Sequence, residues 1–112
     1  MIRATTPKHV FIFESDPSSY KRILITYSQN GRIVMEKEKD ELTIEEIRNA
    51  FNDITGYAVW FRLTQEETKS FTSGSNKMVT VQVRVLTETD EALASDKKTF
   101  SVQDVLNDEV LT

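Results

Sequence analysis

The single histidine is the residue best suited to acid–base or nucleophilic chemistry, because imidazole titrates near neutral pH. His9 begins an apolar stretch and follows Lys8. The chain has no cysteine, so a catalytic triad would have to be built around His9. Such a site needs several convergent partners, and the sequence indicates none. We therefore expect His9 to have a structural role at a strand end.

Two pairs of adjacent acidic residues, Glu45/Glu46 and Glu66/Glu67, are the next candidates for chemistry. A glycosidase requires two carboxylates that face one cleft. Adjacent residues of a helix diverge by about 100°, so neither pair forms such a dyad. Acidic residues are favoured at helix starts, where they cap backbone N–H groups, and we expect both pairs to act in this way.

The remaining acidic residues form no ligand-binding pattern. Asp104, Asp108 and Glu109 lack the turning glycine and the register of a calcium loop. A chain without cysteine forms no disulfide, zinc finger or iron–sulfur site, and no glycine-rich phosphate-binding motif is present. The sequence therefore predicts no catalytic residue, no metal and no cofactor, and indicates that the protein is not an enzyme.

Length and charge limit the organisation and the partners. The 112 residues are enough for a single domain, and 14 basic against 18 acidic residues give a net charge of −4. An acidic chain is a poor nucleic-acid binder. Arg62 and Arg84 are candidates to share a sheet face, and Lys97 and Lys98 form a minimal basic pair. No apolar run suits a signal peptide or a membrane span, so we expect no membrane partner and no secretion by a signal peptide.

Hydrophobic alternation predicts about six strands. In the first, residues 9–14, both alternating sets are apolar, which indicates a strand covered on both faces. Asn30-Gly31 predicts a type I′ turn that joins the second and third strands into a hairpin. The last strand is interrupted by charges and is expected at a sheet edge. The remaining predicted strands are residues 21–28, 32–37, 57–63, 78–87 and 92–102.

Residues 43–53 are predicted to form an α-helix. Thr43 and Glu46 have the spacing of a capping box, and Gly56 suits the helix end. Apolar residues recur at helical spacing (Ile44, Ile47, Phe51 and Ile54). The alternative is a short extended segment. A second capping box, Thr64 to Glu67, opens one or two helical turns.

These elements together predict a mainly β domain, an antiparallel β-sandwich of about six strands with one short α-helix and one helical turn. Residues 1–8 are expected to be a flexible arm, residues 9–102 the sandwich core, and residues 103–112 an acidic tail. Antiparallel strands fit turn-linked segments at this spacing better than a parallel sheet does.

Trp60 is the most informative aromatic residue, because it faces away from its strand neighbours Val59 and Phe61. Two interpretations remain open. The helix predicted at residues 43–53 covers Trp60, which we favour because that helix needs a sheet face to pack on. Otherwise Trp60 is exposed and forms part of a binding surface for a protein, a peptide or a carbohydrate.

Two longer stretches and two shorter ones carry a resemblance to a known group. The stretches are VWFRLTQEET at residues 59–68, VQVRVLT at 81–87 followed by EALASD at 91–96, TPKH at 6–9 and ITYSQN at 25–30. They resemble small uncharacterised proteins encoded in prophages of Gram-positive bacteria. The strand–LTQEET–strand order is more distantly similar to the N-terminal β-sandwich domain of phage baseplate upper proteins. Ser28 replaces the usual alanine, and residues 41–56 resemble an insertion.

The resemblance implies a setting but transfers no catalytic residue. It implies a phage structural or virion-assembly protein that contacts itself or other phage structural proteins, in the host cytoplasm during assembly or in the virion. We expect such contacts at sheet edges or at the N-terminal arm. Five residues are the candidates for interaction: Trp60, Arg62, Arg84, Lys97 and Lys98.

Overall fold

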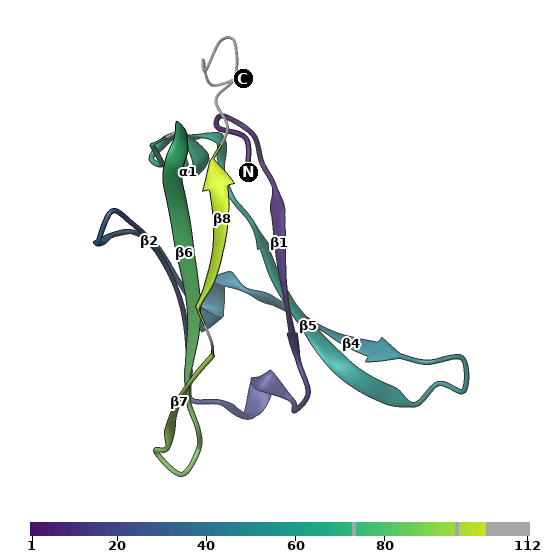
Figure 1. The fold of residues 1–112 in the computed structure, drawn as a ribbon. Helices are drawn as coiled ribbons and strands as arrows, with labels where there is room; N and C mark the ends of the chain where they lie inside the picture. Colours follow the sequence, from purple (N-terminus) through teal and green to yellow (C-terminus); the bar gives the residue numbers. More distant parts are fainter. Residues whose placement is uncertain (73, 96, 103–112) are drawn as a thin grey trace.

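The computed structural model describes residues 1–72, 74–95 and 97–102, with the backbone alone at 74–77. These residues form two antiparallel sheets that pack face to face, which confirms the predicted mainly β, sandwich-like class (Figure 1). The small sheet has three strands in the order β1-β5-β4. The large sheet has five strands in the order β3-β2-β6, with β7 and β8 both beside β6.

The small sheet consists of β1 (Lys8–Phe13), β5 (Ile54–Arg62) and β4 (Thr43–Arg48). Phe13, the last residue of β1, lies opposite Tyr57. The part of β5 that precedes Tyr57 therefore has only β4 beside it. As a result, the β4–β5 hairpin projects beyond β1 and away from β6 and β7 (Figure 1).

The large sheet contains the predicted Asn30-Gly31 hairpin. Both turn residues have positive φ, 55° and 74°, as a type I′ turn requires. The long strand β6 joins this hairpin to β7 and β8, so the predicted last strand is two short strands interrupted near its charges. The strands of this sheet are β2 (Arg22–Gln29), β3 (Arg32–Glu38), β6 (Gly74–Leu86), β7 (Ala92–Ala94) and β8 (Lys98–Val102).

The helix predicted at residues 43–53 is wrong. Residues 43–48 form β4 instead, which pairs with β5, and Ile44 and Ile47 lie on opposite faces of the sheet. The side chain of Asn49 accepts the backbone N–H groups of Phe51 and Asp53, which closes the hairpin. Long-range pairing with β5 has overridden a local helical pattern whose apolar positions were mostly β-branched isoleucines, which favour strands.

The second capping box is confirmed at α1 (Gln65–Lys69). The hydroxyl of Thr64 accepts the N–H of Glu67 at 3.1 Å, and the carboxylate of Glu67 accepts the N–H of Thr64 at 2.9 Å. Short 3-10 turns at Pro17–Ser19 and Lys39–Glu41 complete the connections. The α1 helix follows β5 and carries the chain from the small sheet towards β6 of the large sheet.

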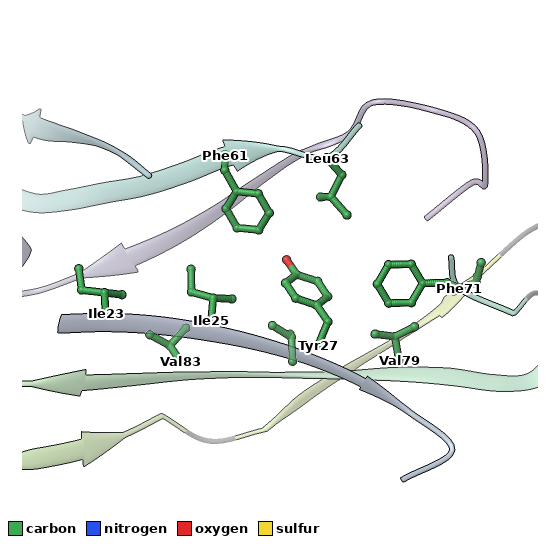
Figure 2. Close-up of a cluster of buried hydrophobic side chains, with 10 residues drawn as sticks. Ile23, Ile25, Tyr27, Phe61, Leu63, Phe71, Val79 and Val83 are labelled. Atoms are coloured by element: carbon green, nitrogen blue, oxygen red, sulfur yellow. The ribbon is translucent and has the colours of Figure 1, made fainter. Parts of the chain in front are cut away.

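The core fills the space between the two sheets (Figure 2). Tyr27 of β2 lies at its centre and makes edge-to-face contacts with Phe61 and Phe71. The Tyr27 hydroxyl meets Nδ1 of His9 at 2.5 Å, so the predicted structural role of His9 fits its position on β1. The other fully buried apolar side chains come from both sheets (Ile23, Ile25, Val59, Leu63, Val79 and Val102).

The first seven residues, expected to be a flexible arm, make several hydrogen bonds with the body of the domain. The N-terminal ammonium group donates to the carbonyl of Ser101 at 3.0 Å. Thr5 exchanges two hydrogen bonds with the buried side chain of Thr68. The predicted acidic tail, residues 103–112, lies outside the described residues.

Candidate interaction surfaces

The side of the small sheet that faces away from the core, here called the outer face, is apolar and open. Residues opposite each other in an antiparallel pair share a face, which places Val10 beside Trp60 and Ile12 beside Ala58. Val10 is 48% exposed and Ile12 is 66% exposed. The expectation that both faces of the first strand are covered is therefore wrong, since among the described residues only its inner side packs on the core.

The outer face continues across β5 because Gly56 has no side chain to separate its neighbours. A Cβ atom at Gly56 would lie 3.3 Å from the carbonyl oxygen of Phe13, tighter than an ordinary contact. It would also lie about 4 Å from side-chain carbons of Ile47 and Ile12. The apolar side chains of β1 and β4 therefore approach each other over this glycine and form one continuous surface.

Trp60 lies on the outer face, half-buried, and among the described residues no helix covers it, so the favoured interpretation, a helix at residues 43–53 over the ring, is wrong. The ammonium group of Lys8 lies instead 4.1 Å from the centre of the ring, in cation–π geometry. The indole Nε1 is buried and has no hydrogen-bond acceptor among the described residues. One face of the ring is thus occupied by a neighbouring cation.

A second apolar surface is an open cleft of about 750 Å³ between β1 and the strands β6 and β7, here called the inter-sheet cleft. The exposed charges of Glu14 and Lys98 are among its lining residues. Val10 and Ile12 of the outer face also reach this cleft, and most of its lining is apolar (Val10, Phe11, Ile12, Phe13, Val81, Val83, Val85 and Leu93).

The third surface is the tip of the β4–β5 hairpin, residues 48–54, here called the hairpin tip. Phe51 is 85% exposed at this tip. The tip is held by local hydrogen bonds, since Arg48 donates to the carbonyl of Asn52 at 2.8 Å and pairs with Glu46 at 2.6 Å. The side chain of Asn49 also accepts two backbone N–H groups of the loop. The aromatic ring is thus presented on an ordered projection.

The charged interaction candidates do not come together as one patch. Arg62 ends β5 and donates to the carbonyl of Thr6, whereas Arg84 lies exposed on β6, opposite Leu24. The expectation that the two arginines share a sheet face is wrong, because they belong to different sheets. Lys97 is exposed before β8, and Lys98 lines the inter-sheet cleft.

The surface residues that the sequence analysis missed are Ile12, Phe51 and Leu93. Ile12 was placed in a strand covered on both faces, and Phe51 was placed on the buried side of a helix. The segment Asn49–Asn52 carried the signal that could have corrected this, because asparagines of this spacing favour a tight turn between strands. Leu93 could not have been placed without knowing the relative widths of the two sheets.

The groups with shifted pKa values belong to the packing between the sheets. Burial and the nearby N-terminal ammonium lower the pKa of His9, and burial raises the pKa of Tyr27. Burial opposes ionisation of Glu67, but the Lys37 ammonium 2.6 Å away and the cap at Thr64 outweigh it and lower the pKa of this carboxyl. None of these three groups lines the inter-sheet cleft.

Among the described residues, no group of three or more histidine, aspartate or glutamate side chains could hold a metal ion. In the same part of the chain, no helix has the length and apolar character needed to cross a membrane. No protein-family model, curated protein or solved structure matches the chain.

Proposed function

We propose that this chain is a non-enzymatic structural or assembly protein of a phage particle and that it acts through protein–protein contacts. The outer face carries this proposal, because Val10, Ile12 and Trp60 form an apolar surface on a regular sheet. Contiguous exposed apolar surface on a small domain is typical of a contact site. The phage setting rests on the resemblance of the segments at 59–68 and 81–87 to prophage proteins.

The shape of the surface favours a protein partner over a small ligand. Small-molecule sites are concave and enclose most of the ligand, whereas the outer face follows a sheet and is open. Protein interfaces have an apolar centre, rich in aromatic residues, surrounded by polar side chains. Trp60 with Val10 and Ile12 supplies such a centre, and Lys8 and Glu45 border it.

The position of the ionisable groups also supports a structural role. A catalytic base must reach a substrate. The imidazole of His9 is stacked on Tyr27, meets Phe61 and Phe100 edge-on, and has Nδ1 engaged by the Tyr27 hydroxyl. This arrangement ties β1 to the large sheet. We propose accordingly that the protein needs no cofactor, that it binds no nucleic acid, and that it works in the host cytoplasm during assembly or within the virion.

The first test is the molar mass in solution, measured by light scattering on a sizing column over a tenfold range of concentration. We expect a mass above the 12.9 kDa of one chain that rises with concentration. The double variant Val10→Thr, Ile12→Thr keeps the strand propensity and removes apolar surface, so it should weaken any contact made by the outer face. Ile33→Thr is the matched control, because Ile33 is 64% exposed on β3 of the other sheet.

A second measurement tests the phage setting. Mass spectrometry of purified particles from the source bacterium should detect the chain in a fixed ratio to the other virion proteins if it is structural. An assembly protein would instead be absent from particles, and the Val10→Thr, Ile12→Thr variant would lower particle yield. A monomer that is absent from particles, with a variant that leaves particle yield unchanged, would contradict the proposal.

The alternative function is a binding module that recognises a carbohydrate or a peptide through Trp60. The position of its ring on the open outer face favours this alternative. The Lys8 ammonium over the ring disfavours it, because a sugar would have to displace this cation. Iodide quenching of the single tryptophan distinguishes the two: a binding module predicts strong quenching at every protein concentration, whereas a contact surface predicts that quenching falls as the chains associate.

A further inference from the structure

Strand β1 is an open edge of the small sheet, because β5 is its only neighbour among the described strands. An edge strand presents unpaired backbone N–H and C=O groups, and proteins usually protect such an edge with charged side chains. The edge strands β4 and β3 follow this rule, since β4 carries Glu45 and Glu46 and β3 carries three charges at residues 36–38. In contrast, β1 carries no charge at residues 10–13, so its edge is open to another strand.

The hydrogen bonds between β1 and β5 show which backbone groups of β1 are free. Just before β1, the N–H of Leu63 donates to the carbonyl of Pro7 at 3.0 Å. Hydrogen-bonded and non-hydrogen-bonded pairs alternate along an antiparallel ladder, so the odd-numbered residues of β1 bond to β5. The N–H and C=O groups of Val10 and Ile12 therefore point towards the open edge.

A second copy of β1 fits this edge best in one antiparallel register. Even-numbered residues must lie opposite even-numbered residues, because only these have free backbone groups. Centred on Phe11, the register places Val10 opposite Ile12. It also places Lys8 opposite Glu14, the residue that follows β1. Centred on Val10, it would place Lys8 opposite Ile12, and centred on Ile12, it would place Glu14 opposite Val10. Of these three registers, only the first pairs apolar residues with each other and opposite charges with each other.

The two charged residues at the ends of β1 lack an opposite charge within one chain. Lys8 lies opposite a like charge, Arg62 of β5, and its ammonium lies over the Trp60 ring. An ammonium has three hydrogen-bond donors, so the ring contact leaves Lys8 able to bind a carboxylate. Glu14 is exposed, and its carboxylate has no hydrogen bond or ion pair among the described residues. In the register centred on Phe11, Glu14 of the second copy supplies the carboxylate that Lys8 lacks.

We propose that β1 pairs with β1 of a second copy, antiparallel and centred on Phe11, to form a symmetric dimer. The small sheet then continues through both copies, with three strands from each. This inference rests on the proposed function and specifies its partner and its mode of contact. The occupant is a second copy because the strand complements itself: Lys8 meets Glu14, and Glu14 meets Lys8. The outer faces join into one apolar surface, and Phe11 meets its own copy on the inner side as an aromatic cross-strand pair.

Charge reversal at the ends of β1 tests the register. Glu14→Lys sets two positive charges opposite each other at both ends of the paired strands, so the dissociation constant measured by light scattering should rise roughly tenfold or more. The double variant Lys8→Glu, Glu14→Lys restores opposite charges at both ends and should recover most of the affinity. Glu45→Lys is the matched control, because it makes the same charge change on β4, the other edge of the same sheet, and should associate like the unmodified chain. All three positions are exposed, and thermal unfolding should confirm that every variant folds.

Amide hydrogen exchange followed by NMR tests the backbone pairing itself. The N–H groups of the odd-numbered residues of β1 bond to β5 and should exchange slowly at every protein concentration. Those of Val10 and Ile12 face the open edge and should exchange rapidly in dilute solution. At concentrations at which light scattering shows the dimer, their exchange should slow roughly tenfold or more. Packing of two outer faces against each other would form no hydrogen bond to these amides.

Protection of the Val10 and Ile12 amides in the dimer, together with the loss caused by Glu14→Lys and its rescue in the double variant, would support the pairing. An assembly in which these amides stay unprotected, or in which Glu14→Lys and Glu45→Lys behave alike, would overturn it. If Val10→Thr, Ile12→Thr dissolves that assembly, the proposed function stands and acts through packing of the outer face. A chain that stays monomeric also overturns the pairing, and detection in phage particles then decides the proposed function separately.

Discussion

The two sheets of this domain differ in how far their inner and outer faces are buried. In the large sheet the inner row of β2 (Ile23, Ile25 and Tyr27) is completely buried. The side of β2 that faces away from the core carries one apolar residue, Leu24, and then Thr26 and Ser28, which tolerate water. In the small sheet the inner side is buried at Val59 and Phe61 and only partly buried along β1, and the outer face is apolar, with Val10, Ile12 and Trp60.

The difference separates residues that stabilise the fold from residues available for contacts. Alternation of apolar and polar side chains is enough to specify a sheet with one solvated face, and the large sheet follows it. The small sheet has apolar residues on both faces, a pattern expected for a strand covered twice, yet only one cover is present among the described residues. The uncovered apolar surface is available to a partner, and substitutions can therefore separate fold from function.

The largest expected effect comes from truncating the same residue type in the two sheets. Ile25→Ala in the large sheet should lower the free energy of unfolding by about 2–5 kcal/mol, because it leaves a cavity in a closed core. Ile12→Ala on the outer face should change it by about 0.5 kcal/mol or less in the monomer, since the side chain already contacts water. Urea denaturation at low protein concentration measures both. Equal losses would mean that the outer face is covered in the single chain.

The second comparison uses two Thr-x-x-Glu patterns, one at the start of helix α1 and one in strand β4. Thr64→Ala removes the cap of α1 and should cost about 1 kcal/mol of stability. Thr43→Ala lies in β4, where its hydroxyl caps nothing among the described residues, and should stay within about 0.5 kcal/mol. Urea denaturation curves for both variants provide the test. A comparable loss at Thr43 would indicate that a helix forms in this segment after all.

These two patterns also show what could be derived from the sequence. At Thr64 the local signal was sufficient, because the helix is short and its cap lies within the same four residues. At Thr43 an identical signal was misleading, because strand pairing with β5 decides the structure and this pairing is not local. The hairpin at Asn30 was predictable for the same reason as α1, since the turn residues themselves require positive φ.

The candidate surfaces were predictable only in part. The alternation of β5 correctly separated Trp60 from Val59, but the side chain that covers the ring, Lys8, belongs to another strand. The exposure of Phe51 followed from the error at residues 43–53 and could not be seen before that error was corrected. The inter-sheet cleft depends on how β1 of one sheet lies against β6 and β7 of the other, which no local pattern encodes.

The third prediction concerns the contact between α1 and the large sheet. Lys37 of β3 and Glu67 of α1 form a partly buried ion pair at 2.6 Å. The lowered pKa of Glu67 means that the folded state favours the carboxylate. The stability that the charged Glu67 contributes is therefore complete above about pH 4.3, and it is lost as the pH falls through the lower pKa of the folded state. Glu67→Gln keeps an acceptor for the helix cap and should cost about 0.5–1 kcal/mol at pH 7.

The pH dependence provides the internal control for this pair. The stability difference between the unmodified chain and Glu67→Gln should shrink as the pH falls through the lowered pKa of Glu67, because the carboxylate is then protonated in the unmodified chain as well. Glu66→Gln, a neighbouring exposed side chain, should show little difference at any pH. A Glu67→Gln effect that is independent of pH would assign the loss to packing and not to the charge.

The smallest expected effect is the pH dependence that His9 contributes where β1 meets the large sheet. Its pKa is lowered by burial and by the N-terminal ammonium, so the unfolded chain binds a proton more readily than the folded one. Stability should therefore rise with pH from the folded pKa up to about 6.5 and stay level above it. His9→Gln should be less stable overall, because it loses the ring contacts with Tyr27, but it should lack this rise between pH 5 and pH 7. Denaturation midpoints across that range measure the slope for both proteins. The same slope in His9→Gln would show that another group causes it.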